Sequence, residues 1–123
     1  MSIKTIFVAG CISGFISVAL GAFGSHGLKN RLSTEMMTVY ETGVRYQFYH
    51  TFALFIAYFA YTQSASKHIL ISGVLFVLGI LLFSGSLYVL SLTSIRTFGM
   101  ITPLGGLCFL AGWVFLGIGI SFR

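Results

Sequence analysis

Glu41-Thr42-Gly43-Val44-Arg45-Tyr46-Gln47-Phe48-Tyr49-His50 leads directly into the uncharged run Thr51 to Tyr61. The first stretch places an acid, a base, an amide, two phenols and an imidazole within ten residues, and the run after it is compatible with lipid. Almost everywhere else the sequence is apolar. Any polar chemistry must therefore be sought first in this stretch.

The composition favours a lipid bilayer as the surroundings of this 123-residue chain. Hydrophobic residues make up 57% and charged residues 7%, against roughly 25% charged residues in soluble domains. A small soluble domain buries only about 60–70% of its surface, which is not enough to hide so much apolar area. We therefore expect an integral membrane protein with one domain, residues 1–123.

Four apolar segments are long enough to be spans, since about 20 residues cross the hydrocarbon core. We predict spans over about residues 5–23, 44–61, 69–92 and 98–122. The first follows Lys4 as a signal peptide would, but its apolar run is longer than a usual signal core and further spans follow. We interpret it as a retained helix. The expected fold is all-α, an antiparallel four-helix transmembrane bundle.

The segment before the second span allows two interpretations. Ser33 or Thr34 can cap a helix, and a half-apolar stretch follows. The segment is either part of one continuous helix over residues 34–62, or a short amphipathic helix on the membrane surface that bends near Gly43 into the second span. We favour the bend.

Glycines offer close helix contacts in the first and last spans. Small residues on one side of a membrane helix let a neighbouring backbone approach closely. We therefore predict helix-packing positions at Gly10, Gly14, Gly105, Gly106 and Gly112. Trp113 lies near the middle of the last span, so we expect it to pack between helices and to need a partner for its N–H.

The basic residues do not indicate nucleic acid, although the net charge is +5. They are dispersed, mostly at the ends of apolar runs, as expected of side chains that anchor at lipid headgroups. Cys11, Cys108 and the three histidines show no metal-ligand spacing, and no nucleophile motif occurs. We predict no metal, no cofactor and no catalytic residue, and we favour a protein that is not an enzyme. His26 is better explained as a C-terminal helix cap than as a ligand.

The polar stretch allows a functional and a structural interpretation. Glu41 and Arg45 are four residues apart, so they share a face of a helix. In the functional interpretation, Glu41, Arg45 and His50 form a proton-titratable or ligand-binding site. Hydrogen-bonding side chains surround that site: Tyr46, Gln47 and Tyr49. In the structural interpretation, which the spacing favours, Arg45 pairs with Glu41 as an interfacial anchor.

Four blocks of the sequence resemble one known family. They are Gly21–Leu28, Glu41–His50, Phe83–Tyr88, and Ile101–Gly106 with Gly112–Trp113. Over nearly its whole length the chain resembles the uncharacterised protein family 0382, also known as domain of unknown function 423. The resemblance implies a small four-span protein of the bacterial cell membrane, and no activity is established for the family.

The motif residues of this family imply a shared polar network. In this chain they coincide with His26, Glu41, Arg45, Tyr46, His50, Ser84, Ser86, Tyr88, Thr102 and Pro103. Because these residues come from the ends of several spans, the resemblance implies that they converge on one polar pocket. Gln47 and Tyr49, from the polar stretch, complete the candidate network.

The sequence supports three functional hypotheses. The first, which we favour, is a non-enzymatic accessory or assembly factor, or a helix-packing module, in a homo-oligomer or a larger membrane complex. The second is a small oligomeric transporter or channel that uses Glu41, Arg45 and His50. The third is a lipid-binding protein or lipid-handling enzyme whose Arg31, Arg45 and Arg96 meet anionic headgroups.

Overall fold

The structure is a computed structural model that describes residues 1–121, and the described residues are helical apart from short connections. The all-α prediction is confirmed for this part of the chain. The helices are α1 (Ile3–Phe23), α2 (Thr34–Gln63), α3 (Lys67–Gly79), α4 (Gly85–Thr93) and α5 (Thr102–Ser121). Single turns of other helix types lie at Gly24–Leu28, Ile80–Ser84 and Arg96–Met100. The predicted last span reaches Phe122, which lies outside the described residues.

Serine side chains begin three of the helices. The hydroxyl of Ser2 accepts a hydrogen bond from the backbone N–H of Thr5 at the start of α1, and Ser33 does the same for Met36 at the start of α2. Ser66 caps α3 in this way. Each cap satisfies a backbone donor that the first turn of a helix leaves without a partner. Ser94 ends α4 in the left-handed conformation, with φ of 60°.

Three helical segments within the described residues are long and apolar enough to cross a membrane: Ile3–Leu28, Lys67–Thr93 and Arg96–Ser121. The second of these is one rod, because the turn Ile80–Ser84 joins α3 to α4 without a break. The segment predicted as the second span lies in α2, which is not among the three. Helix α2 carries the acid, base, amide and imidazole of the polar stretch, which lower its mean hydropathy.

The predicted bend near Gly43, and with it the separate amphipathic surface helix, is wrong. Helix α2 runs without interruption from Thr34 to Gln63. Gly43 is buried beneath α4, where a Cβ would lie 2.9 Å from Cε1 of Tyr88. Its carbonyl oxygen also accepts a hydrogen bond from Ser84, at 2.7 Å. This glycine therefore permits close helix packing and does not turn the chain.

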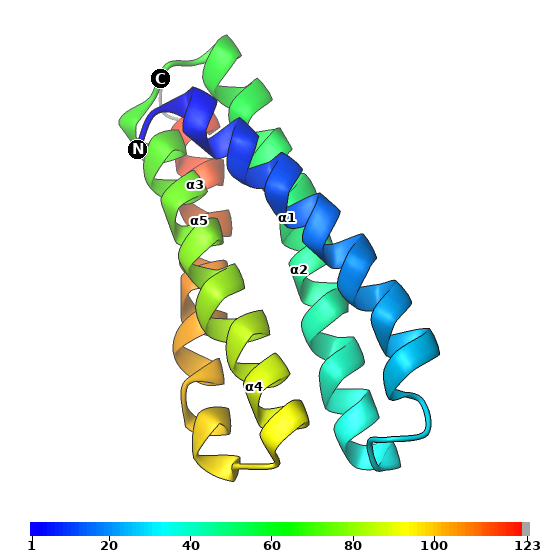
Figure 1. The fold of residues 1–123 in the computed structure, drawn as a ribbon. Coiled ribbons are helices and arrows are strands. Elements are labelled where there is room, and N and C mark those ends of the chain that lie inside the picture. Colours follow the sequence, from blue (N-terminus) through cyan, green and yellow to red (C-terminus); the bar gives the residue numbers. More distant parts are fainter. Residues whose placement is uncertain (122–123) are drawn as a thin grey trace.

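The helices pack side by side in one bundle (Figure 1). Helix α1 lies along α2, the rod of α3 and α4 lies along α5, and α2 contacts both α3 and α4. The start of α1 and the end of α5 lie at the same end of the molecule (Figure 1). Helix α1 touches α3 near that end, where Ile6 packs against Gly73.

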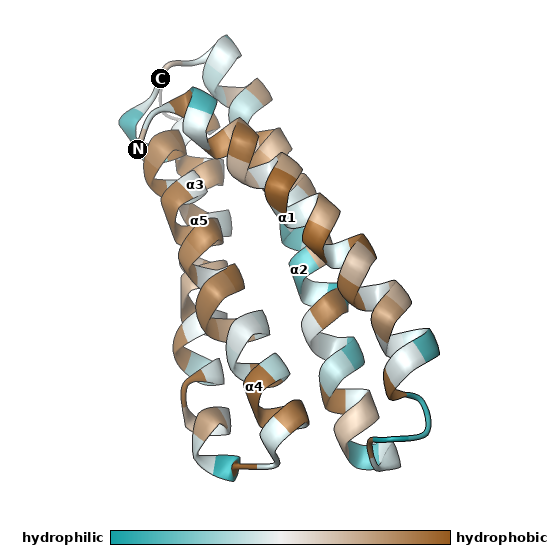
Figure 2. Cartoon of the chain, viewed as in Figure 1, coloured by the Kyte–Doolittle hydropathy of each residue, from teal (hydrophilic) through white to brown (hydrophobic). Residues whose placement is uncertain are grey.

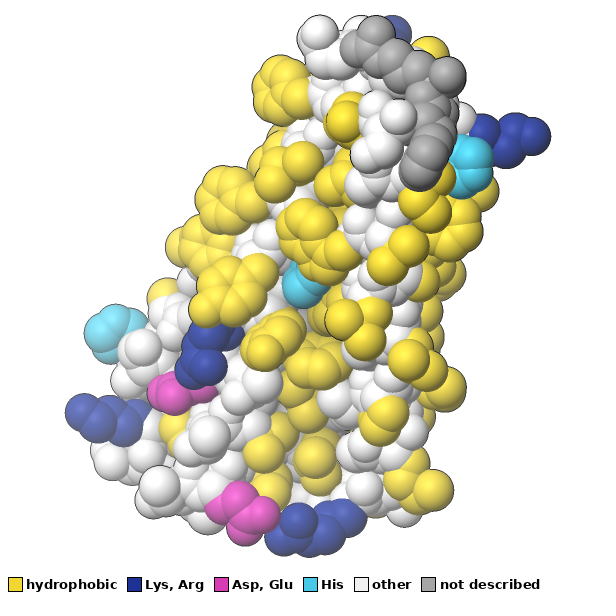
Figure 3. All heavy atoms as spheres, turned by 180° about the vertical axis from the view of Figure 1, so that it is seen from behind, with side chains coloured by type: hydrophobic (Ala, Val, Ile, Leu, Met, Phe, Trp, Pro, Cys, Tyr) yellow, Lys and Arg dark blue, Asp and Glu magenta, His cyan; other side chains and the backbone are white. Residues whose placement is uncertain are grey.

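The bundle is apolar both inside and outside. One core cluster joins four helices through Ile6, Ala53, Leu54, Ala57, Ile69, Phe76, Phe109 and Leu116, and a smaller cluster contains Met36, Leu87 and Leu90. Large apolar side chains also face outward, among them Phe15, which is 77% exposed. Apolar residues dominate α1, α3 and α4 in Figure 2, and in Figure 3 charged side chains are confined to the lower part and upper edge of the visible face. Such a surface suits a hydrocarbon environment.

The predicted packing glycines receive side chains or backbone from neighbouring helices. A Cβ on Gly10 would lie 2.8 Å from the ring of Phe55, and one on Gly112 would lie 2.6 Å from the ring of Phe76. A Cβ on Gly105 would collide with the backbone of Phe83. The approaches to the other two are looser, 3.4 Å from Thr51 for Gly14 and 3.9 Å from Phe83 for Gly106.

We expect Gly105→Ala to lower the free energy of unfolding by about 1–3 kcal/mol, since the added methyl group meets backbone that cannot move aside. The matched control is Gly117→Ala, also in α5, where a Cβ would meet nothing within 4 Å. The control is expected to leave stability unchanged or to raise it by up to about 1 kcal/mol, because alanine favours helix more than glycine does. Thermal unfolding of both variants in one mild detergent measures the difference. Equal effects at the two positions would contradict the packing described for Gly105.

Candidate functional site

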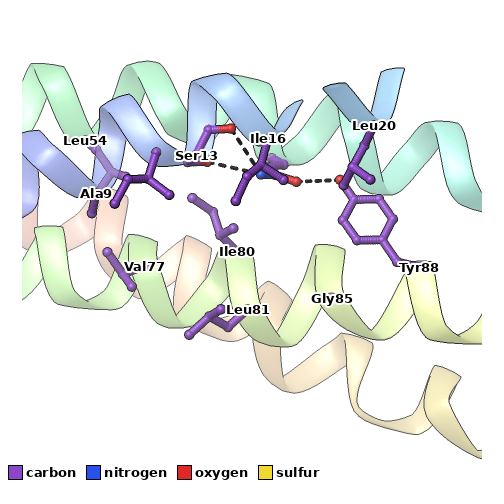
Figure 4. A pocket seen from close by; sticks show the side chains of 12 residues that line it. Ala9, Ser13, Ile16, Leu20, Leu54, Val77, Ile80, Leu81, Gly85 and Tyr88 are labelled. Atoms are coloured by element: carbon purple, nitrogen blue, oxygen red, sulfur yellow. Dashed lines mark hydrogen bonds between the residues drawn. The ribbon is translucent and has the colours of Figure 1, made fainter. Parts of the chain in front are cut away.

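Gln47 is the centre of a buried hydrogen-bond network that joins three helices. Its side chain is 3% exposed. The amide nitrogen donates to the carbonyl oxygen of Ser13 at 3.2 Å and to the Ser13 hydroxyl at 3.3 Å, both in α1. The amide oxygen accepts from the hydroxyl of Tyr88 in α4, at 2.5 Å. Figure 4 draws these bonds.

The bonds around Gln47 close into a ring. Thr51 donates its hydroxyl proton to the backbone carbonyl of Gln47, at 2.9 Å. The hydroxyls of Ser13 and Thr51 are 2.7 Å apart, and because the Thr51 proton is already used, Ser13 must be the donor. The protons therefore point in one direction from the Gln47 amide through Ser13 and Thr51 to the Gln47 carbonyl. A closed ring of this kind satisfies each member without water.

Other hydroxyl groups connect the same helices. Tyr40 donates to the carbonyl oxygen of Leu20 at the end of α1, at 2.5 Å, and its ring packs against that of Tyr88. Ser84 donates to the carbonyl of Gly43. Within the described part of the chain, no buried side-chain nitrogen or oxygen lacks a hydrogen-bond partner.

His50 lies between α2 and α5, apart from the Gln47 ring. Its Nδ1 is 2.8 Å from the carbonyl oxygen of Tyr46, and its Nε2 is 3.1 Å from Nε1 of Trp113. The indole N–H can only donate, so Nε2 accepts and Nδ1 carries the proton. The ring stacks on Phe109, with centroids 3.5 Å apart and planes at 9°. This arrangement holds a neutral imidazole, because a protonated one would lose the bond to Trp113.

The N–H of Trp113 has a partner as predicted, and this partner is His50. The indole itself is 43% exposed, so the prediction that it packs between helices is wrong. Tyr46, 38% exposed, packs on Phe83 and forms one wall of a groove of about 530 Å³ beside His50 and Trp113. Tyr49 is exposed on the outside of α2.

Glu41 and Arg45 do not form the ion pair that their spacing predicts. The one ion pair among residues 1–121 joins Glu35 to Arg96, with 3.3 Å between Oε1 and Nη2. Glu41 and Arg45 are both exposed and line a cavity of about 310 Å³ between the end of α1 and the first half of α2.

The candidate network is divided among separate places. Gln47 and Tyr88 are bonded to each other, and Ser84 is bonded to the carbonyl of Gly43. Ser86 and Thr102 form a separate pair at the start of α5, 2.6 Å apart. His26 is exposed in the turn that follows α1. The described residues also contain no group of three or more His, Cys, Asp or Glu side chains placed to hold a metal ion.

Sequence reasoning missed Ser13, Thr51 and Phe109 as site residues. Ser13 is one of several small residues in the first span, and the sequence does not show which of them bonds a neighbouring helix. Thr51 and Phe109 stand in apolar runs whose pattern gives no sign of which face is buried.

An apolar cavity of about 350 Å³ lies beside the ring (Figure 4). Branched side chains of α1, such as Ile12 and Ile16, form one wall, and Ile80 and Leu81 form the other. Gln47 and Tyr88 contribute polar atoms to its lining, and these atoms are bonded to each other. The cavity therefore offers apolar surface to whatever occupies it.

Comparison with known proteins assigns the family. Residues 20–106 match the model of the "Protein of unknown function (DUF423)" family. The chain belongs to this family. It is 42% identical over 114 residues to the UPF0382 membrane protein YwdK of Bacillus subtilis, covering 92% of this chain and 93% of that protein. It is 41% identical over 119 residues to the UPF0382 inner membrane protein YgdD of Escherichia coli K12, covering 97% and 91%.

A UPF0382 membrane protein of Staphylococcus haemolyticus is 45% identical over 113 residues, with 92% of each chain covered. No solved structure matches the chain. These relatives and the three apolar helices agree that this family member is a membrane protein. The names of the relatives give no activity.

We expect Tyr88→Phe to cost about 1 kcal/mol of unfolding free energy and Gln47→Leu about 1–3 kcal/mol, because the second change removes the side-chain bonds to α1 and leaves the Tyr88 hydroxyl without a partner. The double variant should cost less than the sum, with a coupling of about 0.6 kcal/mol, the average found for hydrogen bonds within membranes, and of about 1.7 kcal/mol at most. Unfolding in mild detergent gives all three values. Tyr49→Phe, on the exposed side of α2, is the control and should change nothing. Strict additivity would contradict the bond between Gln47 and Tyr88.

Proposed function

We propose that the chain is an antiparallel four-span bundle, in which α2 crosses the membrane in addition to the three apolar segments. Helix α2 has 30 residues, about 45 Å at 1.5 Å per residue. Its polar side chains Gln47, His50 and Thr51 are buried against other helices, where membrane helices normally keep them. Apolar side chains face outward along the same helix: Phe48, Phe52, Ile56 and Phe59. Average hydropathy underrates a helix that keeps part of its polar side chains against other helices.

This topology predicts the side from which single cysteines react. In a background without Cys11 and Cys108, a cysteine at Asn30 should label from one side of the membrane and a cysteine at Ser64 from the other. A cysteine at Ser94 should behave like the one at Asn30. Labelling of intact and opened vesicles with a membrane-impermeant maleimide measures this. Labelling of Asn30 and Ser64 variants from the same side would show that α2 does not cross.

We further propose that this family member is a non-enzymatic accessory or assembly component of the membrane. The observation that carries the proposal is the set of hydrogen bonds around Gln47, in which the closed ring joins α1 to α2 and the bond to Tyr88 joins α4 to both. Groups bonded to each other in this way are not free to act on a substrate. Large apolar side chains on the outer faces of α1, α2 and α5 are instead available for contact with another membrane protein.

The transporter hypothesis has less support. It requires Glu41, Arg45 and His50 to act together. Glu41 and Arg45 line a cavity beside α1, whereas His50 is buried against Phe109 and Trp113 of α5. Both nitrogens of His50 are already engaged.

The test is photo-crosslinking in native membranes from two exposed positions, Phe15 on α1 and Leu110 on α5, combined with native mass spectrometry of the released protein. We expect one face to give a crosslinked protein partner, or a second copy of this chain, in fixed stoichiometry. A buried position, Ala53, is the matched control and should give no crosslink between chains. A monomer with no crosslinked protein from either face would contradict an accessory role.

A further inference from the structure

The cavity beside Glu41 and Arg45 combines opposite charges with apolar walls. It is lined from α1 and the turn after it by Gly21, Gly24 and Ser25, and from α2 by Met37, Tyr40, Glu41, Val44 and Arg45. Its volume of about 310 Å³ lies at the lower end of the range of small-molecule sites. The cavity is therefore of a size for a headgroup and not for a large ligand.

Both charges of this cavity lack an ionic partner within residues 1–121. The chain has two acidic residues, and the other one, Glu35, is taken by Arg96. Figure 3 shows both acidic side chains on one face, each beside a basic one. A charge held at the edge of the hydrocarbon is costly unless a counter-charge meets it. Glu41 and Arg45 are thus available to a ligand that carries both signs.

The order of the charges along α2 fits one class of ligand. Glu41 lies nearer the end of the helix, and Arg45 lies about 6 Å deeper, four residues at 1.5 Å each. In a glycerophospholipid with an ethanolamine headgroup, the phosphate is attached to the glycerol, and two carbons separate it from the outer ammonium. The phosphate therefore lies deeper than the ammonium, in the same order as Arg45 and Glu41.

We propose that this cavity binds the headgroup of a zwitterionic phospholipid that has a primary ammonium. Arg45 binds the phosphate, to which its guanidinium can donate two parallel hydrogen bonds, and Glu41 accepts from the ammonium. The Tyr40 hydroxyl is already bonded to Leu20, so the hydroxyl of Ser25 is the remaining neutral polar group for the headgroup. Met37 and Val44 supply apolar surface for the glycerol and the first carbons of the chains.

The glycines give the cavity its shape. Gly24 is buried against Tyr40, where a Cβ would lie 2.5 Å from Cε1 of that ring, and a Cβ on Gly21 would be in van der Waals contact with Val44, 3.6 Å from its Cγ1. Because neither glycine fills the space between α1 and α2, the headgroup can reach both charges. This site is independent of the protein partner proposed above, since it needs only lipid.

The experiment uses the full-length protein in mild detergent with dioctanoyl phospholipids that carry ethanolamine, choline or glycerol headgroups. Native mass spectrometry counts bound lipid and gives a dissociation constant for each. We expect the ethanolamine lipid to bind about tenfold more tightly than the other two, about the effect of one charged contact of 1.4 kcal/mol. The choline ammonium cannot donate a hydrogen bond, and the glycerol headgroup has no cation.

Variants assign the contacts. Glu41→Gln should reduce ethanolamine-lipid affinity about tenfold, to the level of the glycerol lipid, and Arg45→Gln should weaken all three lipids. Glu35→Gln removes the same charge at the same end of the bundle and is expected to leave the affinities for the three lipids unchanged. Glu41→Ala is a second variant, and thermal unfolding verifies that each variant folds like the unsubstituted protein.

Three results would overturn the proposal. Equal affinity for ethanolamine and glycerol lipids, unaffected by Glu41→Gln, would show that Glu41 does not bind the ammonium and that the site recognises only the phosphate. Equal affinity for ethanolamine and choline lipids would exclude recognition of the primary ammonium. Binding of free phosphoethanolamine as tight as that of the lipid would exclude a lipid as the ligand.

Discussion

The hydrogen bond between Gln47 and Tyr88, with the ring that continues from it to Ser13 and Thr51, is the interaction on which the bundle depends. Lipid offers no partner to a polar group, so an amide inside this protein must be satisfied by other helices. The amide of Gln47 does so on two sides at once, toward α1 and toward α4. One side chain thereby fixes the relative rotation of three helices.

The glycines determine how closely these polar groups can approach. Apolar attraction between helices is weak in a membrane, because lipid tails are as apolar as leucine, and contact therefore relies on fit. Gly43 lets Tyr88 lie flat enough on α2 to reach Gln47, and Gly105 brings the backbones of α5 and of the turn at Phe83 together. The hydrogen bonds between helices thus depend on the close packing that the glycines allow.

Composition and run length were sufficient to predict helices and a membrane environment, because neither depends on which way a helix faces, and the resemblance of four sequence blocks was sufficient to indicate the family. The inward faces were harder to predict. In a soluble protein the apolar stripe marks the core, but α1 and α5 are apolar all round, so periodicity does not separate Ser13 or Phe109 from residues that face lipid. Gly43 was taken as a bend for a related reason, since glycine marks both flexible points and close contacts. The partner of Trp113 was expected from the chemistry of the indole, but its identity as His50 depends on how α5 is placed against α2.

The contact between Trp113 and His50 gives this molecule an internal optical reporter. Trp113 is the only tryptophan in the chain, so indole fluorescence comes from one point, where α5 meets α2. Any event that separates those two helices, or that places a positive charge on the imidazole, removes the hydrogen bond from the indole nitrogen and changes its emission. The docking of the last helix can therefore be followed in the unlabelled protein.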